Sequence, residues 1–129
     1  MILLYIVIGI VVLFFGMQFF MVFKMRLKKG KTAPELSGKA GKLLQKGEQA
    51  LFYFYSPGCR ACKDMTPMMH QMSKYNKGIF PIDISKDMNT AKKFGVMGTP
   101  STVLVKAGTI KEFLVGPQTD AKIASLLRG

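Results

Sequence analysis

Tryptophan is absent from this sequence of 129 residues, and the chain has only two cysteines, one histidine and seven acidic residues. Two cysteines exclude a scaffold built from several disulfides. Together with one histidine they also fall short of the four ligands of a structural zinc site. The acidic residues are outnumbered by 19 lysines and arginines, which gives a formal net charge of +12. A chain this basic is attracted to anionic surfaces such as nucleic acids or lipid headgroups.

The distribution of the basic residues separates these two partners. Residues 39–129 carry 14 lysines and arginines against six acidic residues, a balance of +8, and they are scattered along the chain. No motif combines them with aromatic residues, as a nucleic-acid-binding surface would. We therefore expect no nucleic-acid partner and favour an anionic membrane surface as the neighbour.

Charge is missing altogether from residues 2–23, an apolar run whose only strongly polar side chain is Gln18. At about 1.5 Å per helical residue, the run is roughly 30 Å long or slightly more, which matches the hydrocarbon core of a bilayer. A cleaved signal peptide is the alternative, but no basic residue precedes Lys24 and no A-x-A-like site follows the run. The sequence therefore predicts one transmembrane helix that anchors the chain through residues 1–23.

Residues 24–37 predict a basic juxtamembrane tether between this anchor and a domain at residues 38–129. The tether contains five basic residues: Lys24, Arg26, Lys28, Lys29 and Lys31. Positive charge collects on the cytoplasmic side of a membrane span. We therefore expect a single-pass protein whose domain lies in the cytoplasm, with the periplasmic or another extracytoplasmic side as the alternative.

The first half of the domain predicts a helix, a strand and a second helix. Ser37 is a candidate cap for a short helix that ends at Gly47. Residues 49–56 form a continuous apolar and aromatic run, which indicates a strand buried on both faces. Residues 59–75 predict a helix that Pro67 kinks.

The second half predicts a strand, a helix, a hairpin and a closing helix. Residues 78–85 are a second apolar strand, and the next helix ends at Gly95. Residues 101–116 indicate two strands that turn at Ala107 and Gly108, and an amphipathic helix closes the chain. The order α-β-α-β-α-β-β-α predicts an α/β domain whose mixed four-stranded sheet has helices on both faces.

Both cysteines lie in the stretch SPGCRACKDM, residues 56–65, with two residues between them. With Gly58 ending the strand, Cys59 falls at the amino end of the predicted helix, where unpaired backbone N–H groups and the helix dipole favour an anion. Arg60 and Lys63 add positive charge beside the pair and are expected to tune the thiol pKa. Each feature favours a thiolate, the form that attacks disulfides. A bridge to Cys62 closes almost no loop, so a redox disulfide is favoured over a stabilising one.

The chemistry expected of such a pair is thiol–disulfide exchange. Cys59 attacks a substrate disulfide, Cys62 resolves the mixed disulfide, and the reverse sequence oxidises a dithiol. Because the pair is its own redox group, we expect no further cofactor and no metal. A copper(I) pair is the rival, since MTPMMHQM follows at residues 65–72. Methionines at helical spacing are more typical of core packing, and His70 is expected at the surface of the same helix.

Two longer stretches resemble the thioredoxin family. LFYFYSPGCRACKDMTP, residues 51–67, resembles its strand, active-site turn and kinked helix, and FGVMGTPSTVLVKAGTIKEFLVG, residues 94–116, resembles its second half. The resemblance covers residues 38–129 and implies a thioredoxin-like fold. It implies that Cys59 is the nucleophile and Cys62 the resolving cysteine. Four further positions match the family: Pro100 its cis-proline, which guides the substrate backbone, Thr99 the residue before it, Pro67 the helix kink and Gly116 the glycine after the last strand.

The chain departs from the family at positions that affect the chemistry. Gly58 stands where the family usually has tryptophan, and an Arg-Ala dipeptide between the cysteines replaces Gly-Pro. The family's buried acid falls at Tyr53 and its lysine partner near Pro81, which leaves Asp64, Asp83 or water as hypothetical substitutes. The family's first strand is missing or absorbed into the tether.

These observations predict a membrane-anchored thiol–disulfide oxidoreductase that reduces protein disulfides. Its expected partners are protein dithiols or disulfides, an electron donor or acceptor, and the membrane through residues 2–23. In the cytoplasm cellular reductants keep such a pair reduced, which favours the reductase direction. Two alternatives stay open: a tethered copper(I)-binding module that uses the two thiolates, and an inactive thioredoxin-fold adaptor that docks through its basic surface.

Overall fold

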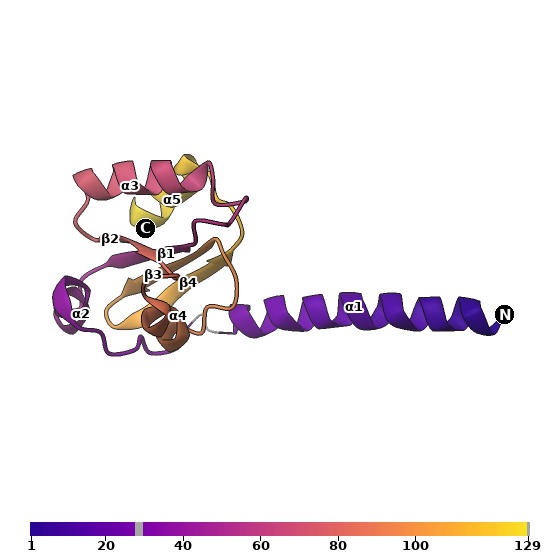
Figure 1. Cartoon of the computed structure of the whole chain (residues 1–129). Helices are drawn as coiled ribbons and strands as arrows, with labels where there is room; N and C mark the ends of the chain where they lie inside the picture. The colour runs from indigo at the N-terminus through magenta and orange to yellow at the C-terminus, as the bar shows by residue number, and fades with distance from the viewer. Residues whose placement is uncertain (28–29, 129) are drawn as a thin grey trace.

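The computed structural model describes residues 1–27 and 30–128 of the chain. A long helix, α1 (Ile2–Arg26), extends from a domain built on a four-stranded sheet (Figure 1). Its elements are, in chain order, α2 (Gly38–Gln45), β1 (Ala50–Tyr55), α3 (Met65–Tyr75), β2 (Ile79–Asp83), α4 (Met88–Phe94), β3 (Ser101–Lys106), β4 (Thr109–Val115) and α5 (Asp120–Arg128). The predicted order of elements is confirmed.

The sheet has the strand order β2-β1-β3-β4, with β1 and β2 parallel and the other pairs antiparallel. β1 lies inside the sheet because its sequence, ALFYFY, is apolar or aromatic on both faces, and its first five residues are buried. The β3–β4 hairpin turns at Ala107 and Gly108, as predicted, with left-handed φ angles of 53° and 73°. The register places Phe54, Ser101 and Val115 at one end of the sheet.

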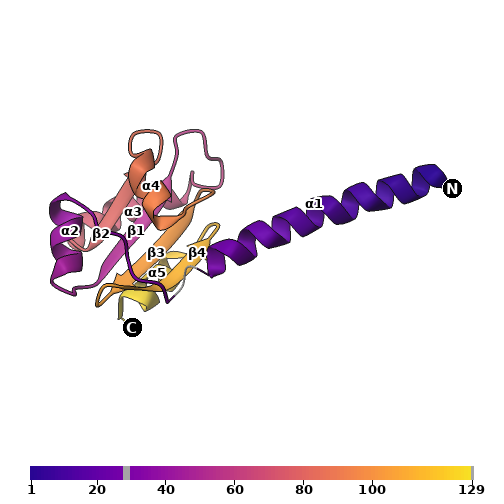
Figure 2. The same ribbon diagram turned by 90° about the horizontal axis from the view of Figure 1, so that it is seen from below.

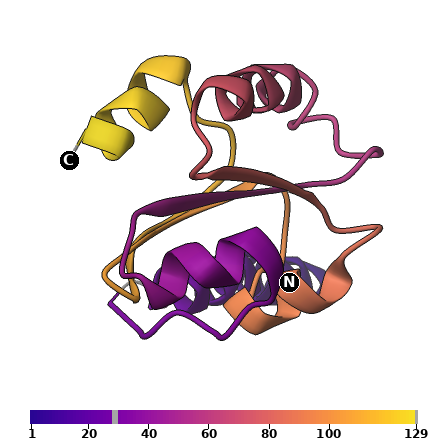
Figure 3. The same cartoon turned by 90° about the vertical axis from the view of Figure 1, so that its left-hand side faces the viewer.

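Alternate residues of β1 supply two separate core layers. Phe52 packs toward α4, with its ring centroid 4.8 Å from that of Phe94. Leu51 points to the opposite face and packs with Met69 of α3 and Ile123 of α5. In Figure 3 the sheet is seen between α3 and α5 on one face and α2 and α4 on the other.

The stretch predicted as a tether is divided in the structure. α1 continues to Arg26, and residues 30–33 run antiparallel to the start of β4. Three backbone hydrogen bonds join them: Gly30 N–H to the Ile110 carbonyl at 2.7 Å, Ile110 N–H to the Lys31 carbonyl at 2.8 Å, and Ala33 N–H to the Gly108 carbonyl at 2.9 Å. The outer edge of β4 offers these groups because no further strand covers it in the described part of the chain. Among the described residues, backbone pairing of the incoming chain with β4 therefore starts at Gly30.

The predicted helix caps are confirmed at α4 and only partly at α2. At the start of α4 the Asp87 carboxylate accepts a backbone N–H of the first turn at 3.2 Å, and the left-handed Gly95 ends the helix as predicted. Ser37 precedes α2 but makes no side-chain capping hydrogen bond. The start of α2 is instead packed closely on the incoming chain, since a Cβ at Gly41 would overlap the Leu36 carbonyl.

Candidate active site

Both cysteines lie in the connection between β1 and α3, beyond the carboxyl end of a buried strand. The helix predicted over residues 59–75 is wrong at its start, since α3 begins at Met65 and the preceding residues form turns. Lys63 N–H donates three residues back, to the Arg60 carbonyl at 3.2 Å, and the first bond of helical spacing runs from Thr66 N–H to the Cys62 carbonyl at 2.8 Å. The thiols therefore precede α3 and do not form its first turn.

Pro67 contributes to this late start. It is the third residue of α3, in the first turn, where a missing N–H is tolerated. Because Pro67 has no N–H to donate to the Lys63 carbonyl, the regular hydrogen-bond pattern is interrupted on its amino side. The predicted kink within a longer helix is thus replaced by a helix that begins two residues before the proline.

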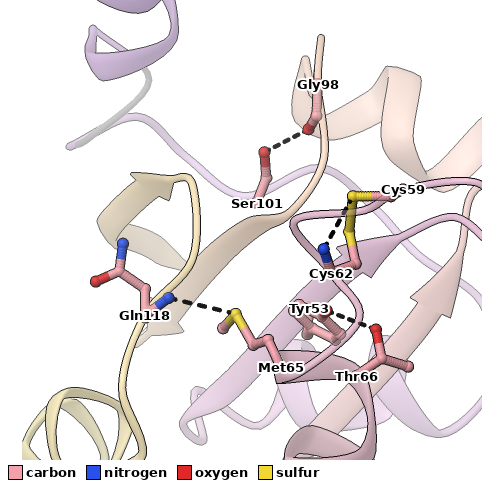
Figure 4. Close-up of a disulfide and its surroundings, with 8 residues drawn as sticks. All are labelled: Tyr53, Cys59, Cys62, Met65, Thr66, Gly98, Ser101 and Gln118. Carbon is pink, nitrogen blue, oxygen red and sulfur yellow. Dashed lines mark hydrogen bonds between the residues drawn. A yellow bond between two sulfur atoms is a disulfide. The ribbon is translucent and has the colours of Figure 1, made fainter.

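A disulfide joins Cys59 and Cys62, whose Cα atoms are 5.3 Å apart (Figure 4). The two differ in burial: Cys59 is half-buried, whereas Cys62 is 2% exposed. The backbone N–H of Cys62 donates to Cys59 Sγ at 3.2 Å. A donor at this position stabilises negative charge on the sulfur once the bond is reduced. The accessible sulfur is therefore also the one equipped to be a thiolate.

The disulfide opens into a pocket of about 460 Å³. The pocket is formed by the β1–α3 connection and the first turn of α3, and its lining includes Tyr55, Pro57, Cys59, Cys62, Thr66 and Pro67. Arg60 and Lys63 line the same pocket, and both are exposed. The structure thus brings both predicted tuning charges to the disulfide, where they favour anionic groups by Coulomb attraction.

The cis-proline expected from the family resemblance is present, since the Thr99–Pro100 bond is cis. Pro100 is buried and directly precedes Ser101, the first residue of β3, which pairs with Phe54 of β1. Because Cys59 follows the same end of β1, the proline and the disulfide lie at one end of the sheet.

Hydrogen bonds hold the proline segment on both sides. Gly116 N–H, just after β4, donates to the Pro100 carbonyl at 2.9 Å, and Ser101 Oγ donates to the Gly98 carbonyl at 2.6 Å (Figure 4). Thr99, between them, is half-buried. The role of Thr99 and Pro100 in holding a substrate backbone stays a prediction from the family.

A family model for thioredoxin matches residues 36–129. The chain belongs to the thioredoxin family. A thioredoxin domain-containing protein of Theileria parva is 28% identical over 79 residues, which are 59% of this chain and 36% of that protein. Thioredoxin of Bacillus subtilis is 32% identical over 66 residues, 49% of this chain and 64% of that protein. This chain therefore spans less than two thirds of the length of either relative.

The fold comparison agrees with this membership. The structure of a mutant thioredoxin from Halobacterium salinarum superposes with a TM-score of 0.60 at 23% identity, covering 77% of this chain and 94% of that one. The thioredoxin-like fold predicted from the sequence is confirmed. α1 and the basic stretch after it lie outside the region that the thioredoxin model matches.

Tyr53 occupies the place of the thioredoxin family's buried acid and is fully buried on the α3 face of β1. Its hydroxyl lies 2.8 Å from Thr66 Oγ1 in the first turn of α3 (Figure 4). Burial raises the pKa of Tyr53 above its ordinary value of 10.0, and the hydrogen bond to Thr66 offsets part of that rise. The phenol therefore stays protonated at neutral pH, so it cannot serve as the base that the family's acid provides.

The neighbours of Tyr53 across the sheet do not restore an ion pair. The register pairs Tyr53 with Pro81 of β2 and with Thr102 of β3. Thr102 is 1% exposed, and its hydroxyl has no hydrogen-bond partner among the described residues. The sequence did not predict the contact between Tyr53 and Thr66, because only the packing of α3 on β1 brings these distant residues together.

The two acids considered as substitutes are engaged elsewhere or exposed. Asp83 accepts hydrogen bonds from Ser85 Oγ at 2.6 Å and from Ser85 N–H at 2.9 Å in the turn after β2. The bond from the Ser85 hydroxyl is the main reason why the pKa of Asp83 is lowered. Asp64 is an exposed residue of the turn before α3. Neither lines the pocket that contains the disulfide.

The methionines after the cysteines mostly serve the core. Met65 and Met69 are 3% and 0% exposed on the face of α3 that packs on the sheet, and Met65 Sδ accepts the Gln118 N–H at 3.4 Å. Core packing, the favoured interpretation, is confirmed for both. His70 is exposed, as expected, and its Nε2 lies 3.2 Å from the Tyr55 hydroxyl.

Proposed function

We propose that this protein is a membrane-anchored thiol–disulfide oxidoreductase that reduces disulfides in protein substrates. The observation that carries the proposal is the unequal pair of sulfurs: Cys59 is accessible beside a pocket, and Cys62 is covered at 2% exposure. Membership of the thioredoxin family supports the same chemistry.

The reaction follows from this inequality. The Cys59 thiolate attacks one sulfur of the substrate disulfide, and the other substrate sulfur leaves as a thiolate that takes up a proton. Cys62 then loses its proton and attacks Cys59 Sγ, which releases the second substrate thiol and forms the Cys59–Cys62 disulfide. Two electrons have passed to the substrate, and a dithiol donor must return them.

The surrounding groups have distinct parts in this scheme. Arg60 and Lys63 stabilise the attacking thiolate, and Thr99 with Pro100 holds the substrate backbone. Since Tyr53 stays protonated, the proton of Cys62 leaves through the adjoining pocket and not to a buried carboxylate. This difference from the family makes resolution by Cys62 the step most sensitive to pH.

The anchor in this proposal is α1. Ile2–Lys24 is long and apolar enough to cross a membrane, with a mean hydropathy of 2.6, and none of it is buried against the domain. Five basic residues follow or end the span, which favours the cytoplasmic side for the domain. A cytoplasmic domain is kept reduced by cellular thiols, and that favours the reductase direction.

Two cysteine variants of the full chain test the chemistry. Cys59→Ser is expected to abolish disulfide reduction, because the remaining thiol is covered. Cys62→Ser is expected to accumulate a mixed disulfide with substrate, visible on non-reducing gels and absent from the double variant. The proposal would be contradicted if Cys62→Ser trapped no disulfide substrate and the wild-type chain, assayed in parallel, reduced none.

The reduction potential of the Cys59–Cys62 pair tests the direction of electron transfer. Titration of the detergent-solubilised chain against glutathione buffers is expected to give a value near or below about −250 mV, as for reductants. A value above about −150 mV would instead mark an oxidant. Absence of a two-electron transition would leave the copper(I) module or the inactive adaptor.

A further inference from the structure

The active-site end of the domain and α1 lie toward the same side of the molecule. In Figure 1 the connection between β1 and α3, residues 56–64, projects toward the side from which α1 extends, and Figure 2 shows the same relation. If α1 spans a membrane, the disulfide is therefore on the side of the domain that faces it.

The path of the chain gives the reason. Residues 30–33 run antiparallel to β4. β4 itself runs toward Gly116, whose N–H binds the Pro100 carbonyl at the active-site end of the sheet. A chain that enters antiparallel to β4 arrives from the end toward which β4 points. The chain from α1 therefore reaches the sheet from its active-site end, and not from the hairpin end at Ala107 and Gly108.

The connection is also short. Three residue steps separate Leu27 from Gly30, which allows at most about 11 Å, and Gly30 N–H is bonded to Ile110 at 2.7 Å. From Ile110 to Val115, β4 advances about 17 Å toward the active site. With this pairing intact, the active-site end of β4 stays within about 35 Å of Leu27 in any orientation of the span.

We propose that the Cys59–Cys62 pair acts on disulfides held close to the bilayer surface, in the segments of other membrane proteins that adjoin their spans. This inference rests on the proposed function and specifies its substrate. Exposed Arg60 and Lys63 beside the disulfide are attracted to anionic headgroups, which favours the same orientation. In each turnover two electrons pass from the dithiol to such a substrate disulfide, and two substrate thiols form.

Two synthetic substrates test the inference. Both are single-span peptides that carry one small disulfide loop. In the first peptide the loop lies about five residues from the span. In the second, about 40 residues of helical repeats, roughly 60 Å long, separate the loop from the span. The pre-reduced full chain is reconstituted with each in phosphatidylcholine and phosphatidylglycerol vesicles, and single-turnover rates are measured. We expect the near loop to be reduced at least tenfold faster than the far loop. Mixed orientation of the chain in vesicles lowers both rates equally and leaves the ratio unchanged.

A variant with about 30 glycine and serine residues inserted after Leu27 is the matched control. Such an insert has a root-mean-square reach of about 30 Å, so the near-to-far ratio is expected to fall to about two or less. Insulin reduction in detergent, measured on both proteins, reports the thiol chemistry alone. Equal rates on the two peptides with normal insulin reduction would overturn the inference and leave the proposed function standing. No reduction of any substrate would overturn both.

Discussion

Positive charge and hydrogen bonding act on the two sulfurs unequally. Cys59 receives the Cys62 N–H at 3.2 Å and shares its pocket with the exposed side chains of Arg60 and Lys63. Cys62 is covered and has the neutral Tyr53–Thr66 pair in its surroundings. The first thiol is thus equipped to start exchange, and the second depends on how its proton leaves.

Removing either charge should weaken the attacking thiol. Arg60→Gln and Lys63→Gln are each expected to slow alkylation of reduced Cys59 by iodoacetamide near pH 6.5 about two- to threefold, because a solvent-screened charge several ångströms away contributes about 0.5 kcal/mol. The rates are measured in a Cys62→Ser background at low salt. Lys77→Gln, beyond the carboxyl end of α3, is the control and should leave the rate unchanged. If all three variants alkylate alike, the two charges are merely solvated.

The buried hydroxyls of Tyr53 and Thr102 predict opposite effects on stability. Tyr53→Phe breaks the 2.8 Å hydrogen bond to Thr66 and is expected to lower the free energy of unfolding by about 1 kcal/mol. Thr102→Val keeps the shape but removes a buried hydroxyl with no partner among the described residues, so it is expected to be neutral or stabilising by about 1 kcal/mol. Urea unfolding of the solubilised chain, followed by near-ultraviolet circular dichroism, measures both. A clear loss of stability in Thr102→Val would mean that this hydroxyl is satisfied after all.

The raised pKa of Tyr53 also predicts how stability depends on pH. The unfolded chain releases this phenolic proton near pH 10.0, whereas the folded chain holds it to higher pH. Above pH 10 the unfolded state therefore binds fewer protons, and the free energy of unfolding falls as the pH rises. Tyr53→Phe should make that fall shallower between pH 10 and 11, and Tyr55, whose pKa burial also raises, should account for part of what remains. An identical slope in wild type and Tyr53→Phe would contradict the assignment.

Among the elements, local patterning predicted the strands and hairpin better than the helix at the thiols. The apolar run of β1 and the Ala107-Gly108 turn depend on a few neighbouring residues, and both were predicted. The start of α3 depends on how the disulfide ring and Pro67 interrupt regular hydrogen bonding, which periodicity does not reveal. Cys59 and Cys62 were likewise identified from their local spacing. The Tyr53–Thr66 contact could be identified only from the packed structure, because the two residues are distant in the sequence.

The docking of residues 30–33 on β4 was also beyond sequence patterning. These residues carry no strand-like alternation, and their pairing follows from the uncovered edge of β4. Leu36 then packs on the core, so residues 30–36 are held at both ends. The distance between α1 and the active-site end of the sheet depends on this docking.

Gly41 offers a direct test of that docking. Gly41→Ala would place a Cβ against the Leu36 carbonyl and is expected to lower the free energy of unfolding by about 1–3 kcal/mol. Gly98→Ala is the matched control, because a Cβ there has no atom within 4 Å, and it should change stability by no more than about 0.5 kcal/mol. Hydrogen exchange of the Gly30 and Ala33 amides should rise in the first variant only. Unchanged exchange at both amides would show that α2 and the incoming segment are independent.

For the whole molecule, charge and connectivity act together. In the proposed arrangement, the apolar helix α1, the basic residues after it and the short connection to Gly30 would place this thioredoxin-family domain next to a lipid surface, with its active-site end toward that surface. The side of the membrane then decides the redox surroundings, since reducing and oxidising compartments drive the same pair in opposite directions. If α1 spans a membrane, the distribution of lysine and arginine on either side of it therefore sets the direction of electron flow through its effect on orientation.

We therefore expect that moving the basic residues to the other side of α1 reverses the orientation of the protein in the membrane. In a bacterial host, the chain with a carboxyl-terminal alkaline phosphatase fusion should be inactive as phosphatase, because the enzyme needs an oxidising compartment and positive charge keeps the domain inside. Replacing Lys24, Arg26, Lys28, Lys29 and Lys31 by glutamine and adding three lysines before Ile2 should make the fusion active in a large fraction of molecules. The Cys59–Cys62 pair should then shift from mostly reduced to mostly oxidised in the same cells, as thiol alkylation would report. A phosphatase that is active without these changes would place the wild-type domain outside and make the oxidised pair its resting state.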